Sequence, residues 1–152
     1  MRTGTILFLM LFSLQLLACT VNKKKNIEPD TPNSTSMKLR ITVGQKKFVA
    51  TLYDNATATA FKAQLPMTLN MTELNENEKY FDLPSSLPTN ASSPGTIQPG
   101  DLMLFGANTL VLFYKELTTP YQYTRLGRID DPTGLSTALG SGNVTVAFEL
   151  DK

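Results

Sequence analysis

The sequence predicts a mainly β protein, folded as a small barrel of seven or eight short strands with two short helices. Three observations lead to this prediction. Apolar residues alternate with polar ones over much of residues 37–152, and a period of two is the period of a strand. Turn signals such as Pro99-Gly100-Asp101 divide these stretches into short segments. Only residues 56–65 and 135–139 carry a pattern typical of a helix.

The first expected strands form a hairpin. Leu39, Ile41 and Val43 alternate with polar residues, residues 44–47 turn the chain, and the alternation resumes over residues 48–52. The further strands that the pattern indicates most clearly are at residues 69–71, 102–105, 110–114 and 144–150. The run at 110–114 is apolar without interruption, which is typical of a strand buried on both faces.

Each expected helix follows a recognisable start signal. Asp54 or Asn55 is a suitable N-cap for the first helix, and Pro66 stops it after Leu65. Because Asp and Asn are favoured at N-caps, capping is the preferred interpretation of this pair over a ligand site. The second helix follows the turn at residues 131–134.

Residues 1–18 have the pattern of a signal peptide. The apolar run from Ile6 to Leu17 would span about 18 Å as a helix, well short of a ~30 Å hydrocarbon core. It ends in Leu16-Leu17-Ala18-Cys19, which resembles a bacterial lipobox. The resemblance implies cleavage before Cys19 and attachment of lipid to its sulfur. The alternative is an ordinary secretory signal that happens to contain a cysteine.

The region after the expected cleavage site divides into a tether and one domain. Residues 19–36 are polar and contain two Pro, so we expect a lipidated Cys19 followed by a flexible linker. Residues 37–152 are expected to form the folded domain. Thr20 follows the cysteine, and the absence of Asp at this position resembles lipoproteins sorted to the outer membrane. The expected location is therefore the bacterial cell envelope, with the membrane contacted through the lipid on Cys19.

Composition excludes several classes of function. The net charge is +1, so the chain has no electrostatic footprint for nucleic acid. The chain has no His and one Cys, which excludes Ser-His and Cys-His nucleophiles, His-ligated metals, an internal disulfide and a Cys-rich zinc site. We find no Gly-rich phosphate loop of standard spacing. We therefore expect no metal and no cofactor.

The order of segments resembles that of bacterial cyclophilin-like fold proteins. The resemblance rests on a strand hairpin, on Leu52-Tyr53-Asp54-Asn55 before a helix that ends at Leu65-Pro66-Met67-Thr68, and on later segments. These later segments are Glu78-Lys79, Pro99-Gly100-Asp101-Leu102, Leu112-Phe113-Tyr114 and Leu126-Gly127-Arg128-Ile129. The resemblance implies a closed eight-stranded barrel with a helix capping each end, in a family most of whose members have no established activity.

Cyclophilins proper are peptidyl-prolyl isomerases, and their active face resembles Phe-His-Arg in one strand and Gln-Gly-Gly in the next. This chain has no His and no Gln-Gly-Gly. Its nearest segment, residues 78–81, offers Lys79 where an arginine is needed, and lysine lacks the planar guanidinium. Arg125 or Arg128 would have to reach in from another strand. We therefore expect no catalytic residue, although the isomerase remains an alternative.

The densest group of aromatic and cationic residues suggests a binding site. Tyr121 and Tyr123 share a strand face with Arg125, so the three are expected to line a pocket. The alternative is a barrel end whose Tyr rings cover the core while the Arg heads lie in solvent. Glu78 and Lys79 are further candidates, because the family resemblance places them near the pocket. The alternative for them is a solvated charged run.

These observations lead to one leading hypothesis and two alternatives. The leading hypothesis is a membrane-anchored binding module for a small molecule or an extended peptide. The first alternative is a prolyl isomerase acting on envelope proteins. The second is a structural subunit of an envelope assembly that uses an outer barrel face.

Overall fold

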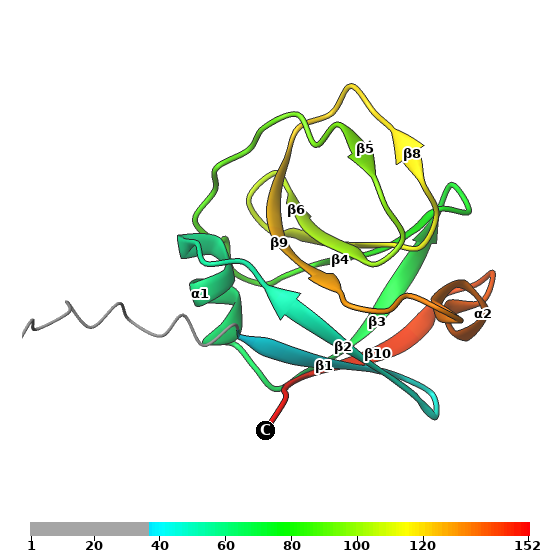
Figure 1. Cartoon of the computed structure of the whole chain (residues 1–152). Helices are drawn as coiled ribbons and strands as arrows, with labels where there is room; N and C mark the ends of the chain where they lie inside the picture. Colours follow the sequence, from blue (N-terminus) through cyan, green and yellow to red (C-terminus); the bar gives the residue numbers. More distant parts are fainter. Residues whose placement is uncertain (1–36) are drawn as a thin grey trace, which may run out of the picture. The chain divides into compact units, whose positions relative to one another are not determined.

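The computed structural model describes residues 37–152, so the signal peptide, Cys19 and the tether lie outside the described residues. Figure 1 shows the elements in chain order. They are β1 (Lys38–Val43), β2 (Lys46–Leu52), α1 (Ala56–Lys62), β3 (Met67–Leu74), β4 (Glu78–Asp82), β5 (Thr96–Ile97), β6 (Asp101–Phe105), β7 (Thr109–Phe113), β8 (Leu117–Thr118), β9 (Tyr123–Ile129), α2 (Leu135–Leu139) and β10 (Val144–Leu150). No helix within residues 37–152 is long and apolar enough to cross a bilayer.

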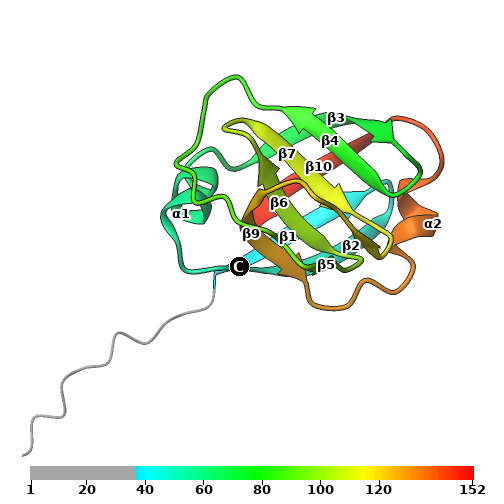
Figure 2. The same cartoon turned by 90° about the horizontal axis from the view of Figure 1, so that it is seen from above.

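Eight strands close into an antiparallel barrel, which confirms the fold class predicted from the sequence. Their order around the barrel is β1-β10-β3-β4-β7-β6-β9-β2, and β5 pairs with β8 in a separate two-stranded sheet. Helices α1 and α2 lie at opposite ends of the barrel (Figures 1 and 2). Closure leaves none of the eight barrel strands with an unpaired edge.

The barrel interior is filled by alternate residues of its strands. Leu39, Ile41 and Val43 of β1 are all buried, as the alternation of the first hairpin predicts. They pack in one cluster with residues of other strands and helices, including Phe48, Phe61, Leu104, Leu112, Leu126 and Phe148. Phe61 of α1 meets Phe148 of β10 edge to face, with ring centroids 6.1 Å apart.

A second, smaller cluster lies on the outer face of the barrel wall. Leu110 and Leu112 of β7 belong to the interior cluster, whereas Val111 and Phe113 belong to this outer one. The outer cluster also contains Ile97 of β5, and Leu117 of β8 packs against it. The small β5–β8 sheet therefore covers part of the wall. This cover explains why β7 is apolar on both faces, as its uninterrupted apolar sequence predicts.

Helix α1 begins as expected but ends earlier than the sequence suggests. Asn55 is the N-cap, and its side-chain oxygen accepts from the backbone N–H of Ala58 at 2.8 Å. The α-helix stops at Lys62 rather than Leu65. The backbone N–H groups of Gln64 and Leu65 bond three residues back, at 3.0 and 3.1 Å, so the last turn is tighter than α-helical. The ring of Pro66 disfavours the α conformation at Leu65, the residue before it, and this accounts for the end of the helix before Leu65.

Candidate functional site

A cavity of about 520 Å³ opens on the outer wall of the barrel, beside the β5–β8 sheet. Its lining comes from several strands and from the loops next to them. The lining residues are Leu74, Asn75, Asn77, Glu78, Tyr80, Asp82, Phe105, Thr109, Val111, Leu117, Thr119, Tyr121 and Tyr123. This volume is within the range of pockets that hold small ligands.

The two-residue period of β4 and β7 builds one wall of the cavity. Glu78, Tyr80 and Asp82 are alternate residues of β4, so their side chains leave the same face of the sheet. On the neighbouring strand, Val111 lies opposite Tyr80 and Thr109 lies opposite Asp82. The Thr109 hydroxyl donates to the Asp82 carboxylate at 2.6 Å, which joins the two strands at the rim.

Aromatic rings continue the same wall beyond β7, because Phe105 of β6 pairs with Thr109, and Tyr123 of β9 pairs with Phe105. The Phe105 ring packs against Tyr121 and Tyr123, with centroid distances of 5.8 and 5.4 Å. Tyr123 is buried and also contacts Phe113 of the outer cluster, at 5.6 Å. Tyr121 is 60% exposed, and Phe105 is 42% exposed. Large aromatic surfaces are thus accessible at the mouth of the cavity, which is typical of binding sites rather than of closed cores.

Two oxygen acceptors in the lining have no protein partner. Glu78 is only 8% exposed, and its carboxylate makes no hydrogen bond or ion pair within residues 37–152. Burial raises the pKa of Glu78 to about 7, and the negative charge of Glu73 adds to the rise. Asn77 Oδ1 is the one side-chain N or O atom in the described residues that is fully buried and has no hydrogen bond, so it has no surface open to the cavity. The Glu78 carboxylate retains a little exposed surface and is positioned to accept from a ligand.

The turn between β3 and β4 holds this part of the wall. Asn75 and Glu76 both have positive φ, at 53° and 57°, and the backbone N–H of Asn77 bonds to the carbonyl of Leu74 at 3.3 Å. These features are those of a type I′ turn. Asn tolerates this conformation, whereas Glu rarely adopts it. The tight turn brings Asn75 and Asn77 to the cavity beside Glu78.

The structure brings three of the five residues proposed from the sequence to this cavity: Glu78, Tyr121 and Tyr123. Arg125 lies on the outer face of β9, beside Met103 of β6, but is not among the lining residues. Its guanidinium donates to the carbonyl of Pro94 at 2.5 Å and lies 3.9 Å from the buried carboxylate of Asp101. Arg125 thus fastens the segment before β5 to the barrel.

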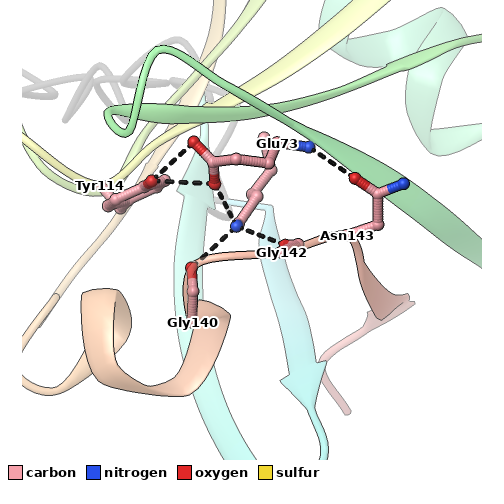
Figure 3. Close-up of polar contacts among 6 residues, drawn as sticks. Glu73, Tyr114, Gly140, Gly142 and Asn143 are labelled. Carbon is pink, nitrogen blue, oxygen red and sulfur yellow. Dashed lines mark hydrogen bonds and ion pairs between the residues drawn. The ribbon is translucent and has the colours of Figure 1, made fainter.

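Lys79 points to the opposite face of β4 from Glu78. Figure 3 shows Glu73, Tyr114, Gly140 and Gly142 gathered around one set of polar contacts. The Lys79 ammonium group forms an ion pair with Glu73 and donates to the carbonyls of Gly140 and Gly142, at 2.8 and 2.7 Å. The side chain is completely buried, and Tyr114 also donates to Glu73 at 2.9 Å. Lys79 therefore holds the chain after α2 against the barrel end.

The alternative considered from the sequence was a run of charged residues in solvent, formed by Glu73, Glu76 and Glu78. It is wrong for Glu73 and Glu78. Glu73 is part-buried and bonded to Lys79 and Tyr114, and Glu78 is buried at the cavity, whereas Glu76 is exposed. The sequence analysis missed other lining residues, among them Tyr80, Asp82 and Phe105. Alternation along residues 78–82 was a signal that grouped Tyr80 and Asp82 with Glu78 and separated all three from Lys79.

A second cavity, of about 410 Å³, lies near the C-terminus and is lined by Arg40, Leu65, Pro66, Glu149, Leu150 and Lys152. Arg40 is already paired there, 2.5 Å from Asp151 and 3.8 Å from Glu149. Its charge is therefore compensated. The first cavity, with its unpartnered acceptors and exposed rings, is the stronger candidate site.

Comparisons with known proteins agree with the fold. A family model described as the cyclophilin-like family matches residues 41–149. The chain belongs to the cyclophilin-like family. A similar solved structure is the solution structure of the hypothetical protein AF2241 from Archaeoglobus fulgidus, with a TM-score of 0.57 and 18% sequence identity. The match covers 76% of this cyclophilin-like chain and 95% of the archaeal one. A search of curated proteins finds no match.

These comparisons establish the barrel and leave the chemistry of this cyclophilin-like protein to its own residues. At 18% identity the archaeal structure supports the fold alone. Within residues 37–152 no group of three Cys, Asp or Glu side chains is arranged to hold a metal ion. What the cavity offers is aromatic surface, two carboxylates and amide or hydroxyl groups.

Proposed function

We propose that this chain is a lipid-anchored, cyclophilin-like binding module of the bacterial envelope, which takes a small molecule or an extended peptide in the cavity on its outer wall. The observation that carries the proposal is a cavity of about 520 Å³ that combines exposed aromatic rings with the unpartnered acceptors of Glu78 and Asn77. Concave sites with apolar walls and a few convergent polar groups are the usual form of ligand pockets.

The apolar and polar parts have separate roles in this proposal. Burial of a ligand against Phe105 and Tyr121 supplies affinity, because both rings lose contact with water. A donor on the ligand satisfies the Glu78 carboxylate, and this requirement selects which ligands bind. The rings and the acceptors come from different parts of the chain, so the closed barrel fixes their spacing.

The lipid anchor of the proposal rests on the sequence at Cys19. Several acyl chains add about 0.8 kcal/mol per buried CH₂ group, so together they hold a protein at a membrane essentially permanently. In this proposal the polar residues 20–36 are the linker that joins the lipidated Cys19 to the domain. A module on such a tether meets ligands or peptides that are themselves in the envelope.

The lining gives no support to the isomerase alternative. No arginine of residues 37–152 lines the cavity, and Arg125 and Arg128 both lie near Asp101, at 3.9 and 3.6 Å. The assembly alternative draws on the exposed side chains of Leu74, Phe105 and Tyr121. Because all three border the cavity, the same surface serves the binding module.

The test is a search for ligands that bind at this cavity in the full chain, held in detergent micelles. A library of small molecules and short extended peptides is screened by thermal shift, with each hit then titrated into Tyr121→Ala. Hits at the cavity lose at least about fivefold in affinity, as expected for an aromatic contact worth ~1 kcal/mol. Tyr53→Ala removes another exposed tyrosine, outside the cavity, and leaves affinity unchanged. Hits insensitive to Tyr121, or no hits at all, contradict the proposal.

A further inference from the structure

The charged groups of the cavity all have one sign. Its lining contains two carboxylates, Glu78 and Asp82, and no Lys or Arg. The nearby basic residues are engaged elsewhere: Lys79 with Glu73 on the other face of β4, and Arg125 with Pro94. An anionic ligand would face uncompensated repulsion here, whereas a positive charge would find complementary groups.

The acceptors in the lining have capacity for a donor-rich group. Glu78 is 8% exposed and its carboxylate accepts no bond from residues 37–152, and Asn77 Oδ1, which is fully buried, is also without a donor. Each desolvated acceptor costs free energy until a donor reaches it. An ammonium group brings three N–H donors and a guanidinium brings five, and neither offers an acceptor that would compete.

The aromatic wall favours the same charge. Tyr80, Phe105, Tyr121 and Tyr123 all line the cavity. Ring faces carry partial negative charge and attract cations within about 6 Å of the ring centre. A cation between Glu78 and Tyr123, on which the Glu78 charge acts, would be stabilised from two sides, by the ring quadrupole and by a charge-assisted hydrogen bond.

We propose that the ligand carried in this cavity is an organic cation, an amine or a guanidinium, whose positive group lies against Glu78 while its apolar part contacts Phe105 and Tyr121. This inference rests on the proposed binding function and names the class of ligand. The positive group belongs either to a small amine or to a Lys or Arg side chain of an extended peptide. Both sources present the same chemistry to the site.

The first experiment compares positively charged probes with neutral probes of similar shape, using the full chain in detergent micelles and calorimetric or NMR titration. Benzylammonium, which has three N–H donors, is compared with benzyl alcohol, a neutral molecule of similar shape. An acetylated and amidated Gly-Arg-Gly peptide is compared with the same peptide carrying citrulline. Each cation is expected to bind at least about tenfold more tightly than its neutral counterpart, a ratio equal to ~1.4 kcal/mol.

Substitutions then place the cation. Glu78→Gln keeps the shape of the side chain, removes its charge, and is expected to reduce cation affinity about tenfold with no loss for benzyl alcohol. Glu76→Gln makes the same change of charge two residues away, on an exposed side chain outside the lining, and is expected to have less than about a twofold effect. Equal losses of cation affinity in both variants would overturn the proposed contact, because the losses would then come from the net charge of the protein and not from a contact with Glu78.

The outcomes separate this inference from the binding function on which it rests. Tighter binding of benzylammonium indicates a small amine as the source, and tighter binding of the arginine peptide indicates a peptide side chain; both support the inference. Neutral or anionic ligands that bind at Tyr121 while the cations do not would overturn the inference and leave the binding module intact. No cavity ligand of any charge would overturn both.

Protonation of Glu78 supplies an independent test of the contact between the cation and the Glu78 carboxylate. Glu78 lies near Glu73 of β3, and its charge also acts on Tyr114 after β7 and on Tyr123 of β9. Since a proton on Glu78 removes the charge that the cation needs, affinity is expected to fall as pH decreases below about 7. Glu78→Gln should bind weakly with a flat profile over the same range. A pH-independent affinity in the native chain would contradict the role of Glu78.

Discussion

The buried ammonium of Lys79 is paired with the carboxylate of Glu73 across the β3–β4 pair. Figure 3 shows that the same ammonium reaches the carbonyls of Gly140 and Gly142 beyond α2. Lys79 thus satisfies acceptors left free where a helix ends. Because it is completely buried, its charge depends on these partners for stabilisation, and the pair joins the chain after α2 to the barrel.

Lys79→Met is therefore expected to destabilise the protein. The change leaves the part-buried Glu73 without its cation and two carbonyls without their donor, so the free energy of unfolding should fall by about 2–3 kcal/mol. Chemical denaturation measures the loss. Lys47→Met removes an exposed lysine and should change the value by less than ~0.5 kcal/mol. Equal stability of the two variants would show that the buried ion pair contributes nothing.

The position of Glu78 makes stability depend on pH in an unusual direction. Its pKa in the folded protein is about 7, above the ordinary value of 4.5, so the folded state holds the proton more tightly than the unfolded state. The stabilisation that the proton on Glu78 gives to the folded state is fully present below pH 4.5 and is lost as pH rises to about 7. Glu78→Gln should therefore raise the unfolding free energy at about pH 8, by on the order of 1–3 kcal/mol, and have little effect at about pH 4. Chemical denaturation at the two pH values measures the difference, and a gain that is equal at both would contradict the raised pKa.

The pKa of Glu73 is shifted in the opposite direction from that of Glu78, so Glu73 serves as an internal comparison. Burial raises its pKa, but hydrogen bonds from Lys79 and Tyr114, together with the Lys79 charge, outweigh burial and leave the pKa below 4.5. Its contribution is present above pH 4.5 and is lost on acidification. Thermal unfolding of Glu73→Gln should thus show a deficit near neutral pH that shrinks on acidification. A deficit that does not depend on pH would contradict this assignment.

Gly127 is required because β9 runs very close to its neighbour β2 at this position. A Cβ at this position would lie 2.5 Å from the carbonyl oxygen of Thr51 and 3.1 Å from the Cα of Leu52, and backbone atoms cannot move aside easily. Gly127→Ala should lower the unfolding free energy by roughly 2–3 kcal/mol. A Cβ at Gly142 meets no atom within 4 Å, so Gly142→Ala should be nearly neutral. Similar values for both variants would contradict the close approach.

Prolyl isomerisation is expected to be absent or weak. The cavity lacks an arginine among its lining residues, and Arg125 is bonded to Pro94. The full chain should not shorten the tens of seconds that cis–trans exchange of a proline peptide takes at about 25 °C. A clear acceleration that is lost in both Arg125→Ala and Arg128→Ala would instead favour the isomerase alternative.

Anchoring through Cys19 is expected to decide where the protein partitions. With acyl chains on its sulfur and amino terminus, the protein should enter the detergent phase on phase separation with a nonionic detergent. Cys19→Ser removes the site of lipid attachment, so this variant should remain in the aqueous phase or be retained uncleaved. Ser34→Ala changes a residue of the expected tether and should partition as the native protein does. Identical partitioning of the native chain and Cys19→Ser would contradict the anchor.

Local patterns in the sequence were enough to predict most elements of the fold. The alternation of Leu39, Ile41 and Val43 placed one face of β1 inside, and Asn55 identified the start of α1. The uninterrupted apolar run of β7 predicted burial on both faces. These signals are local, since a strand's period and a helix cap act between residues close in the chain. The family resemblance then gave the closed barrel, which the structure confirms.

The candidate site was predictable only in part. Tyr121, Tyr123 and Glu78 were identified from the sequence and lie around one cavity, whereas Lys79 and Arg125 are directed to other partners. A charged residue in a sequence shows what it can bind, and its direction depends on which neighbours lie within reach. The pairings of β4 with β7 and of β6 with β9 set those neighbours.

By itself, the sequence determined most strand and helix positions, a pair of candidate capping residues and the absence of His-based chemistry, because these depend on residue type and short-range spacing. Only the tertiary structure decided that the β3–β4 turn, the outer face of β7 and the segment around Tyr121 enclose one cavity. It also decided that Glu78 stays without a partner among residues 37–152 while Lys79, its neighbour, is fully paired. Alternation places adjacent residues on opposite faces, and barrel closure determines what each face meets.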